Sequence, residues 1–282
     1  MTSPRVWLTL ALMFVAFDAA AETAVVTLAE GGARVLRGAT WYKLVTGARI
    51  EESDIVEAFD RSQIQIEFSA GPRANLVGSA KMYLVPATAK ASPRGPSVLS
   101  VPLGWLKVAA IAPGLRLRTA AFDLIVADGI VVMHAAGPAV EFFVEAGSAR
   151  LVEVTANGSD GPARDVKSGE YVSRSTVGAF ATAQRAPKAF IDAMPRHFVD
   201  ALPLLAARIK TKPALVADHD ITYAEAEPWL AGRDRPVFEK RFATRLRDPA
   251  FRSAVLPNLA RYPLWDRQLN PDKYAPKDKV AK

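Results

Sequence analysis

The segment from Gln63 to Phe68 alternates strictly between polar and apolar residues, and this alternation constrains the fold more than any other feature of the chain. In a strand, successive side chains point to opposite faces, so Ile64, Ile66 and Phe68 would share one face. Apolar stretches of similar length recur on both sides of this segment, with glycine-containing turns between them. The pattern predicts a mainly β fold built from short strands, as a sandwich or a coiled β structure.

The β region divides into two units on composition. Residues 22–85 form the first unit, and residues 86–97, rich in Ala, Ser, Pro and Lys, predict a linker. Residues 98–180 form the second unit, and weak similarity between the units leaves open a degenerate repeat and a single domain. Turns in the second unit are predicted at Asp128-Gly129, Gly137-Pro138 and Gly147.

A small α-helical region is predicted over residues 187–270. Phe190, Met194, Phe198 and Leu202 are spaced by four, but Pro195 and Pro203 interrupt the pattern, which favours two or three short helices. Thr222 is the predicted N-cap of a further helix. Another helix places its apolar side on Phe238, Phe242 and Leu246, and residues 271–282 are predicted to be a flexible tail.

The N-terminus is typical of a secretory signal peptide over residues 1–21. Arg5 precedes an apolar run from Val6 to Phe17, and three alanines end at Ala21, near which we predict cleavage. Twelve apolar residues are too few to span a bilayer, which needs about 20. We therefore expect an exported mature chain that begins near Glu22 and has no membrane span.

Charge and cysteine content narrow the functional classes. The chain has no cysteine, so disulfides and thiolate metal sites are excluded. Its net charge is +7, and residues 187–282 account for most of it, with 18 Lys and Arg against 12 Asp and Glu. A basic segment suits an anionic surface, although a solvated face is the plainer interpretation, and export disfavours a nucleic-acid partner.

Five carboxylates between residues 51 and 60 raise the possibility of an active site. A glycosidase needs two carboxylates at a fixed separation, one of them in an apolar pocket. Acids scattered over a turn give no sign of that arrangement, so we interpret them as the solvated side of a turn and a strand and predict no catalytic residue. They are Glu51, Glu52, Asp54, Glu57 and Asp60.

No metal or cofactor site is predicted. Asp218, His219 and Asp220 are adjacent, whereas a metal site normally draws ligands from several segments, so we predict a polar loop there. His134 is predicted to be a strand residue with a satisfied hydrogen bond, and His197 a surface or boundary residue.

The candidate partner-binding residues are aromatic or basic. Trp41 and Tyr42 follow the turn at Gly38, and Trp105 follows Gly104. Exposed aromatic rings can stack on sugars; the alternative for the tryptophans is that they anchor cores and domain contacts. Arg241 and Arg245 belong to the basic side of the predicted helix that carries Phe238.

The first β unit resembles the FecR domain, a periplasmic domain family. The resemblance rests on Gly38, on Leu44-Val45-Thr46-Gly47, on the strand that starts at Ser62, and on Gly71 with the strands from Leu76 to Leu84. Ala48 and Ala70 depart from the family pattern at turn positions. The resemblance covers about half of the chain and implies a periplasmic β fold. The best-known members sense a transporter and signal through a membrane helix, which this sequence lacks.

Together these features predict an exported, non-enzymatic binding or scaffold protein of the bacterial envelope, with sensing as one form of that role. The expected partner is an envelope protein or a cell-wall polymer. The alternative function is hydrolysis of cell-wall polymer. A cleft lined by acids from both β units would favour the enzyme, and an apolar or basic patch would favour the binding protein.

Overall fold

A computed structural model describes residues 22–87, 96–155, 158–175 and 178–274. It confirms a mainly β chain with a smaller helical C-terminal region. The predicted signal peptide, most of the predicted linker and residues 275–282 lie outside the described residues. The first strand begins at Glu22, where the mature chain is predicted to begin.

The first β unit contains seven strands. The predicted strand from Gln63 to Phe68 is β6, and its three apolar residues are buried as expected. Gln65 and Glu67 are also buried, at 1% and 5% exposure, because a later segment covers the second face. The strands are β1 (Glu22–Glu30), β2 (Ala33–Arg37), β3 (Thr40–Lys43), β4 (Arg49–Glu51), β5 (Ile55–Ala58), β6 (Gln63–Phe68) and β7 (Arg73–Val85).

Strands of the second unit are longer than the sequence pattern suggested. Asp128, Gly129 and Gly147 lie inside the β10–β11 hairpin at register shifts, so the predicted turns there are wrong. The predicted turn at Gly137-Pro138 is confirmed as the tip of this hairpin. The strands are β8 (Ser97–Ala110), β9 (Leu115–Arg118), β10 (Phe122–Ala136), β11 (Ala139–Val154), β12 (Asp160–Lys167), β13 (Tyr171–Arg174) and β14 (Ala181–Ala183).

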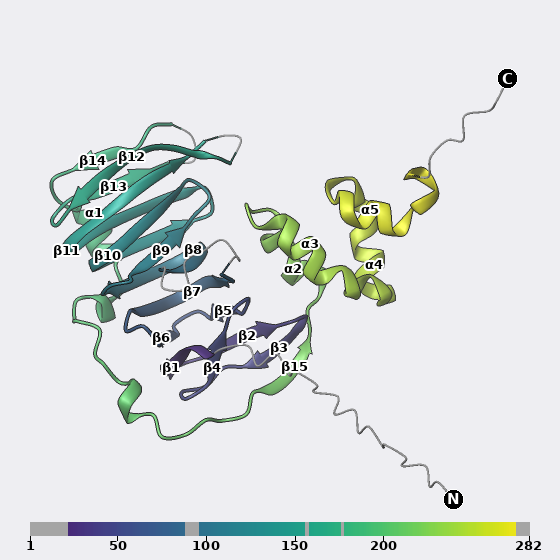
Figure 1. The fold of residues 1–282 in the computed structure, drawn as a ribbon, viewed down its shortest axis with the longest axis horizontal. Helices are drawn as coiled ribbons and strands as arrows, with labels where there is room; N and C mark the ends of the chain where they lie inside the picture. Colours follow the sequence, from purple (N-terminus) through teal and green to yellow (C-terminus); the bar gives the residue numbers. More distant parts are fainter. Residues whose placement is uncertain (1–21, 88–95, 156–157, 176–177, 275–282) are drawn as a thin grey trace, which may run out of the picture.

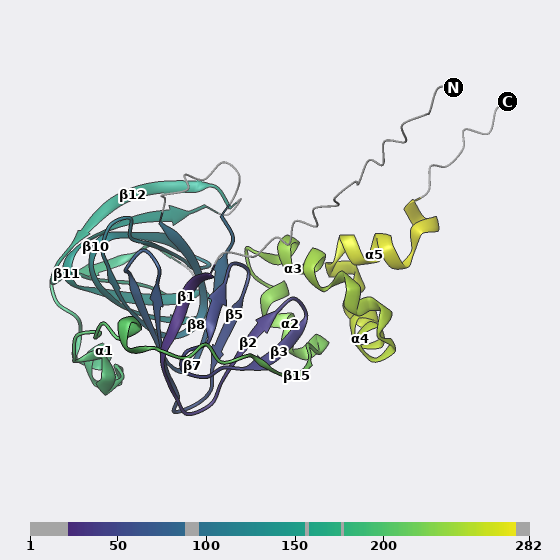
Figure 2. The same ribbon diagram turned by 60° about the horizontal axis from the view of Figure 1, so that its bottom comes forward.

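Both β units belong to one 15-stranded sheet. Its main order is β14-β13-β11-β10-β9-β8-β7-β5-β2-β3-β15, where β15 is Val216–Asp220. The two units are joined by the pairing of β7 with β8, which includes Val85 opposite Val98. The sheet is strongly curved (Figure 2). It packs around a large apolar core that includes Val26 and Ile64 from the first unit and Phe122 and Phe142 from the second. The two units therefore share one hydrophobic interior, which makes them one structural domain.

A long segment then crosses the outside of the sheet. After α1 (Lys188–Ala193), residues 194–215, here called the connecting segment, contain only two short 3-10 turns, η1 (Arg196–Phe198) and η2 (Ala206–Arg208). In Figure 1 this segment runs beneath the sheet to β15 (Val216–Asp220), which pairs with β3. The predicted polar loop over Asp218–Asp220 is thus wrong, because the edge of β3 accepts these residues as a strand.

The helical lobe, residues 223–274, lies beside the sheet (Figure 1). Phe238, Phe242 and Leu246 are all buried, which confirms the predicted apolar side. Residues 271–274 form a 3-10 turn in which Lys273 and Tyr274 both donate to Asp266. The elements are α2 (Tyr223–Leu230), α3 (Arg235–Phe242), η3 (Ala243–Arg247), α4 (Pro249–Val255), η4 (Leu256–Arg261), α5 (Pro263–Leu269) and η5 (Pro271–Tyr274).

A second apolar core joins the lobe to the sheet. Leu36, Trp41 and Tyr83 of the sheet pack in the same cluster as Phe238 and Trp265 of the lobe. Burial of large side chains from both partners is the main source of cohesion in such a junction. None of the helices in the described part of the chain has the length and apolarity needed to cross a membrane.

Candidate functional site

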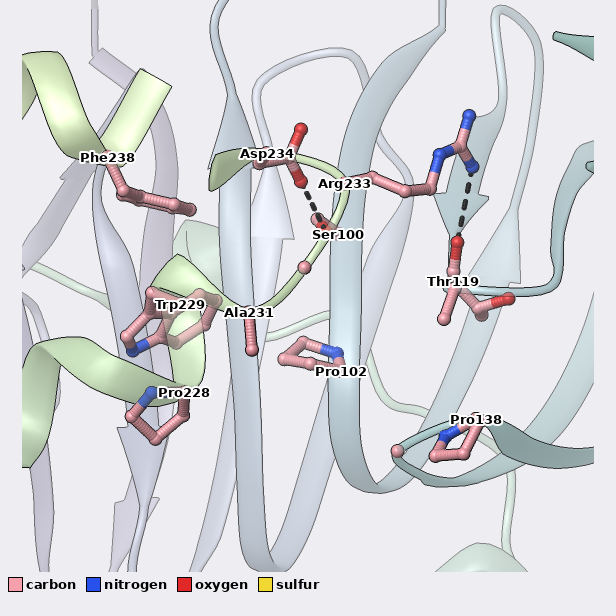
Figure 3. Close-up of a pocket in the computed structure, with 13 residues that line it drawn as sticks. Ser100, Pro102, Thr119, Pro138, Pro228, Trp229, Ala231, Arg233, Asp234 and Phe238 are labelled. Carbon is pink, nitrogen blue, oxygen red and sulfur yellow. Dashed lines mark hydrogen bonds between the residues drawn. The ribbon is translucent and has the colours of Figure 1, made fainter. Parts of the chain in front are cut away.

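A pocket of about 310 Å³ lies where the helical lobe meets the sheet, and we call it the interlobe pocket (Figure 3). Its volume is at the lower end of the range for small-molecule pockets. One wall comes from β8, the turn before β10 and the tip of the β10–β11 hairpin, and the other from α2, the following turn and α3. The lining residues are Ser100, Pro102, Thr119, Ala120, Gly137, Pro138, Pro228, Trp229, Ala231, Gly232, Arg233, Asp234 and Phe238.

The walls of the interlobe pocket are mainly apolar. The ring of Trp229 lies 5.5 Å from that of Phe238, and Phe238 in turn packs edge-on against Tyr83 at 4.9 Å. Pro102, Pro138 and Pro228 add rigid apolar surface. A surface of this kind favours an apolar group, because burial of that group removes hydrocarbon from water.

Local sequence explains how α2 presents this wall. The Thr222 hydroxyl accepts from the Glu225 N–H, and the Glu225 carboxylate accepts from the Thr222 N–H, so the predicted cap is a complete capping box. Partial burial opposes ionisation of Glu225, but hydrogen bonds from Thr222 and Arg34 outweigh it and lower its pKa to about 2. The helix therefore starts at a fixed position and carries Trp229 to the pocket.

Two charged residues of the α2–α3 turn, which lines the pocket, form hydrogen bonds to the sheet. Arg233 donates to Asp123 Oδ1 at 2.6 Å and to the Thr119 carbonyl at 3.2 Å. Asp234 accepts from Ser100 Oγ at 2.9 Å and from Arg118 Nη1 at 3.1 Å. Figure 3 shows both side chains reaching from the lobe toward the sheet. Because each charge is already paired within the chain, the pocket has little capacity for a charged ligand.

The five carboxylates of residues 51–60 are not uniformly solvated. Asp54 and Glu57 are 1% and 4% exposed, so the prediction is wrong for these two. Arg37 pairs with both Asp54 and Glu51 at 2.7 Å, while Glu57 pairs with Arg34 at 2.8 Å and Lys81 at 3.0 Å. Asp60 and Glu52 are exposed as predicted. The buried acids therefore brace strands through ion pairs.

Two of the predicted aromatic residues lie side by side on β3 but in different environments. Trp41 is fully buried in the second core beneath the Arg34 guanidinium, which lies 3.8 Å from its ring. It offers no surface to a partner in this conformation, so the prediction that it contacts a partner is wrong here. Tyr42 is half-buried and lines a second, more polar cavity of about 270 Å³ beside Arg37 and Glu51.

Trp105 is half-buried on the outer face of the sheet. Its ring stacks on His134 at 4.4 Å and packs against Phe190 of α1 at 5.2 Å. His134 lies in β10 and contacts Glu141 at 3.2 Å, which confirms the predicted strand histidine with a hydrogen bond. Trp105 thus supports α1 in this structure.

Arg241 and Arg245 point into the molecule rather than away from it. Arg241 donates to the carbonyls of Leu36, Gly38 and Ser53. Arg245 pairs with Asp220 at 2.9 Å and Asp248 at 3.1 Å. Arg241 thus links the lobe to the first β unit, and Arg245 links the lobe to β15. In this conformation neither guanidinium group is free to form the predicted basic contact surface.

Phe238 and the Gly137-Pro138 turn are recognisable in the sequence, but no sequence pattern joins the lining residues into one site. Pro102, Pro138 and Trp229 are separated by long stretches of chain and meet only through the hairpin and the lobe. A local sequence motif cannot predict that such distant residues lie together. His197 is exposed, as predicted. Within the described residues, no group of three His, Cys, Asp or Glu side chains is arranged to hold a metal ion.

Comparisons with known proteins give distant structural likenesses. No protein-family model matches the chain. No curated protein matches it. Two crystal structures of proposed anti-sigma factors from Parabacteroides distasonis ATCC 8503 resemble it, at 11% and 10% identity and TM-scores of 0.40 and 0.38. The matches cover 49% and 46% of this chain and 64% and 59% of those chains, under two thirds of their length. Likenesses this distant carry no inference about partner or mechanism.

Proposed function

We propose that the chain is a non-enzymatic binding or scaffold protein and that the interlobe pocket receives an apolar group of its partner. The observation that carries this proposal is the chemistry of the pocket. Its walls are Trp229, Phe238 and three prolines, and its charges are paired internally. Such a site favours binding of an apolar group of matching shape, and buried apolar groups are the usual anchors in partner recognition.

The alternative, a hydrolase of cell-wall polymer, has less support. Among the residues that line the interlobe pocket, Asp234 is the one carboxylate, whereas hydrolysis of a glycosidic bond ordinarily needs two. Asp234 also accepts hydrogen bonds from Ser100 and Arg118, so its carboxylate oxygens are already engaged within the chain. We therefore place binding first.

We further propose that the mature chain works in the periplasm as a FecR-like module, with sensing as one form of its role. This part rests on the signal-peptide pattern of residues 1–21 and on the glycine and strand motifs of the first unit. N-terminal sequencing of the protein from a periplasmic extract tests it. A start near Glu22 supports export, and an intact Met1 in a cytoplasmic fraction contradicts it.

An envelope protein fits the interlobe pocket better than a cell-wall polymer does. Protein partners supply apolar side chains, while polymer sugars and carboxylates are polar. Exposed basic residues of the lobe, such as Arg247 and Arg252, remain available to an anionic polymer as the second candidate. The two partners differ in salt dependence, because screening weakens exposed charge contacts and leaves apolar burial intact.

The test is a pull-down with residues 22–282 against isolated sacculi and a detergent-solubilised envelope extract, each at low and high salt. Ala231→Phe fills the interlobe pocket without removing any of the contacts described above, and Ala224→Phe, at an exposed position within α2, is the control. Capture of one envelope protein at high salt, lost in A231F and kept in A224F, supports the proposal. Salt-sensitive retention on sacculi, unchanged in A231F, would instead favour the polymer.

Catalysis is tested separately with purified residues 22–282 and sacculi as substrate. We expect no release of soluble fragments above that of buffer. Release that disappears in Asp234→Asn would overturn the non-enzymatic part of the proposal and identify the pocket as an active site.

A further inference from the structure

One row of residues crosses the outer face of the sheet and changes from polar to apolar along its length. Register pairs Gln65 with Asn75 and Asn75 with Lys107, and the same row continues through Val132 of β10. It then reaches Phe143 of β11 and Tyr171 of β13. Buried polar residues on an outer sheet face are unusual unless something supplies their hydrogen bonds.

The connecting segment supplies those bonds through its backbone. Lys107, fully buried, donates to the Phe198 carbonyl at 2.6 Å and the Asp200 carbonyl at 2.9 Å, and it also pairs with Glu145. Gln65 donates to the Pro203 carbonyl at 2.8 Å. The contacts with the connecting segment are made to its main-chain carbonyls, so they do not depend on the identity of its side chains.

The neighbouring row contacts the backbone in the same way. Arg73 donates to the Leu202 carbonyl at 2.9 Å. The Glu67 carboxylate accepts from the Leu205 N–H at 2.6 Å and the Ala206 N–H at 3.1 Å. Sheet side chains thus contact carbonyls and amides along residues 198–206, as a peptide-binding surface does for an extended ligand.

Two apolar side chains anchor this stretch. Phe198 and Leu202, four residues apart, are 1% and 5% exposed, and Phe198 packs with Val132, Tyr171 and Phe190. Val199, between the two anchors, is 70% exposed, and Leu204, after the second anchor, is 68% exposed. The stretch therefore has the character of a docked peptide, with anchored and free side chains in turn.

The outer face also has hydrogen-bonding capacity that the connecting segment leaves unused. Asn75 is 1% exposed and lies between Gln65 and Lys107, yet neither atom of its amide has a hydrogen-bond partner within the described structure. A buried amide without partners is destabilising. An extended peptide in a different register offers both a carbonyl and an N–H, and it would satisfy Asn75.

From these contacts we propose that the face beneath residues 198–206 is a peptide-binding surface that the chain's own segment occupies. Its external ligand is an extended stretch of a partner protein with two apolar side chains four residues apart. The inference rests on the proposed binding function and adds a second contact site to it, distinct from the interlobe pocket. Partner binding then requires release of residues 198–206, which couples recognition to a rearrangement of the connecting segment.

The probe for this proposal is a fluorescent synthetic peptide with the sequence of residues 195–209. A tethered segment competes at an effective concentration in the millimolar range, so the wild-type chain should bind the free peptide weakly. Leu202→Ala in residues 22–282 weakens the tethered segment, and we expect this variant to bind the peptide at least about ten times more tightly. A peptide with alanine at both anchor positions should bind neither protein.

Two further variants locate the binding site. Adding Arg73→Met to the L202A protein removes one backbone contact and should weaken the peptide about fivefold, whereas adding Ala231→Phe should leave its affinity unchanged. Equal weakening by both changes would contradict the assignment to the outer face. The peptide could fail to bind the L202A protein while the pull-down still captures a partner that A231F loses. That result would overturn this proposal and would leave the proposed function unaffected.

A wild-type experiment keeps the test valid even where L202A does not fold. Millimolar peptide should raise deuterium uptake at the amides of Leu205 and Ala206, since displacement breaks their bonds to Glu67. Unchanged uptake would contradict the proposal. Dimers of the L202A chain in sedimentation, without binding of the free peptide, would also overturn it in favour of segment exchange between two copies.

Discussion

At the scale of single residues, Arg241 shows how a charged side chain serves the interior of this protein. It is partly buried, which lowers the pKa of its guanidinium, and it donates to three backbone carbonyls: those of Leu36, Gly38 and Ser53. Arg241→Met removes these three hydrogen bonds and should lower the free energy of unfolding by about 2–4 kcal/mol. Urea unfolding measures this loss. Lys240→Met, an exposed neighbour, should change it by less than about 0.5 kcal/mol, and equal effects would refute the structural role.

Glu225 gives a residue-scale prediction about pH. Its pKa is lowered from 4.5 to about 2 in the folded chain, so its ionised form stabilises the fold. This stabilisation is fully present above about pH 4.5 and is lost as pH falls toward 2. At pH 7, Glu225→Gln should destabilise by about 1–2 kcal/mol, through loss of the capping box and of the Arg34 pair.

The measurement is thermal unfolding of wild type and E225Q between pH 7 and pH 3. Their difference in Tm should shrink below about pH 4.5. Glu227→Gln, on the same helix with a looser 3.5 Å contact to Arg261, should show a smaller difference. A gap between wild type and E225Q that is constant with pH would mean that the carboxylate charge is not what stabilises the helix start.

At the scale of elements, the β10–β11 hairpin shows where sequence patterns stop being informative. Glycine suggested turns at Gly129 and Gly147, yet the two glycines face each other across a continuous hairpin. Each has positive φ, and a Cβ on Gly147 would lie 2.4 Å from the Asp128 carbonyl oxygen. Glycine permits both a turn and a bulge, and only the partner strand decides between them.

This close approach predicts a difference between two alanine substitutions. Gly147→Ala combines positive φ with a backbone clash and should destabilise by about 2 kcal/mol or more. Gly137→Ala, at the tip of the same hairpin, has φ +65° and nothing within 4 Å of its added Cβ, so about 1 kcal/mol is expected. Urea midpoints compare the two variants. Similar losses would mean that φ alone explains both glycines.

Other elements were predictable to different extents. The alternation of β6 and the Thr222 cap are local signals, and the structure confirms both. Strand β15 was missed because Val216–Asp220 is polar and fully exposed, and only the free edge of β3 recruits it. The interlobe pocket and the polar row through Asn75 were missed for the same reason, since both are made by residues that meet only in the folded chain.

At the scale of the whole molecule, the shared core and the junction ion pairs predict that sheet and helical lobe unfold together. Trp41 and Tyr83 from the sheet lie in one cluster with Trp229 and Trp265 from the lobe, and Arg233 and Asp234 bridge the two parts. Far-UV circular dichroism follows mainly the sheet. Tryptophan fluorescence follows mainly the junction, where Trp41, Trp229 and Trp265 lie, with a contribution from Trp105 on the sheet. The two urea transitions should therefore coincide.

Phe238→Ala tests this coupling directly, because the Phe238 ring contacts Tyr83 of the sheet and Trp229 and Phe242 of the lobe. Truncation of a buried phenylalanine typically removes about 3–5 kcal/mol, so both transitions should shift to lower urea by the same amount. Phe122→Ala, deep in the sheet core, should likewise move both probes together. If F238A instead shifts the fluorescence transition alone, the lobe unfolds independently, and the interlobe pocket would then exist only while the lobe is docked.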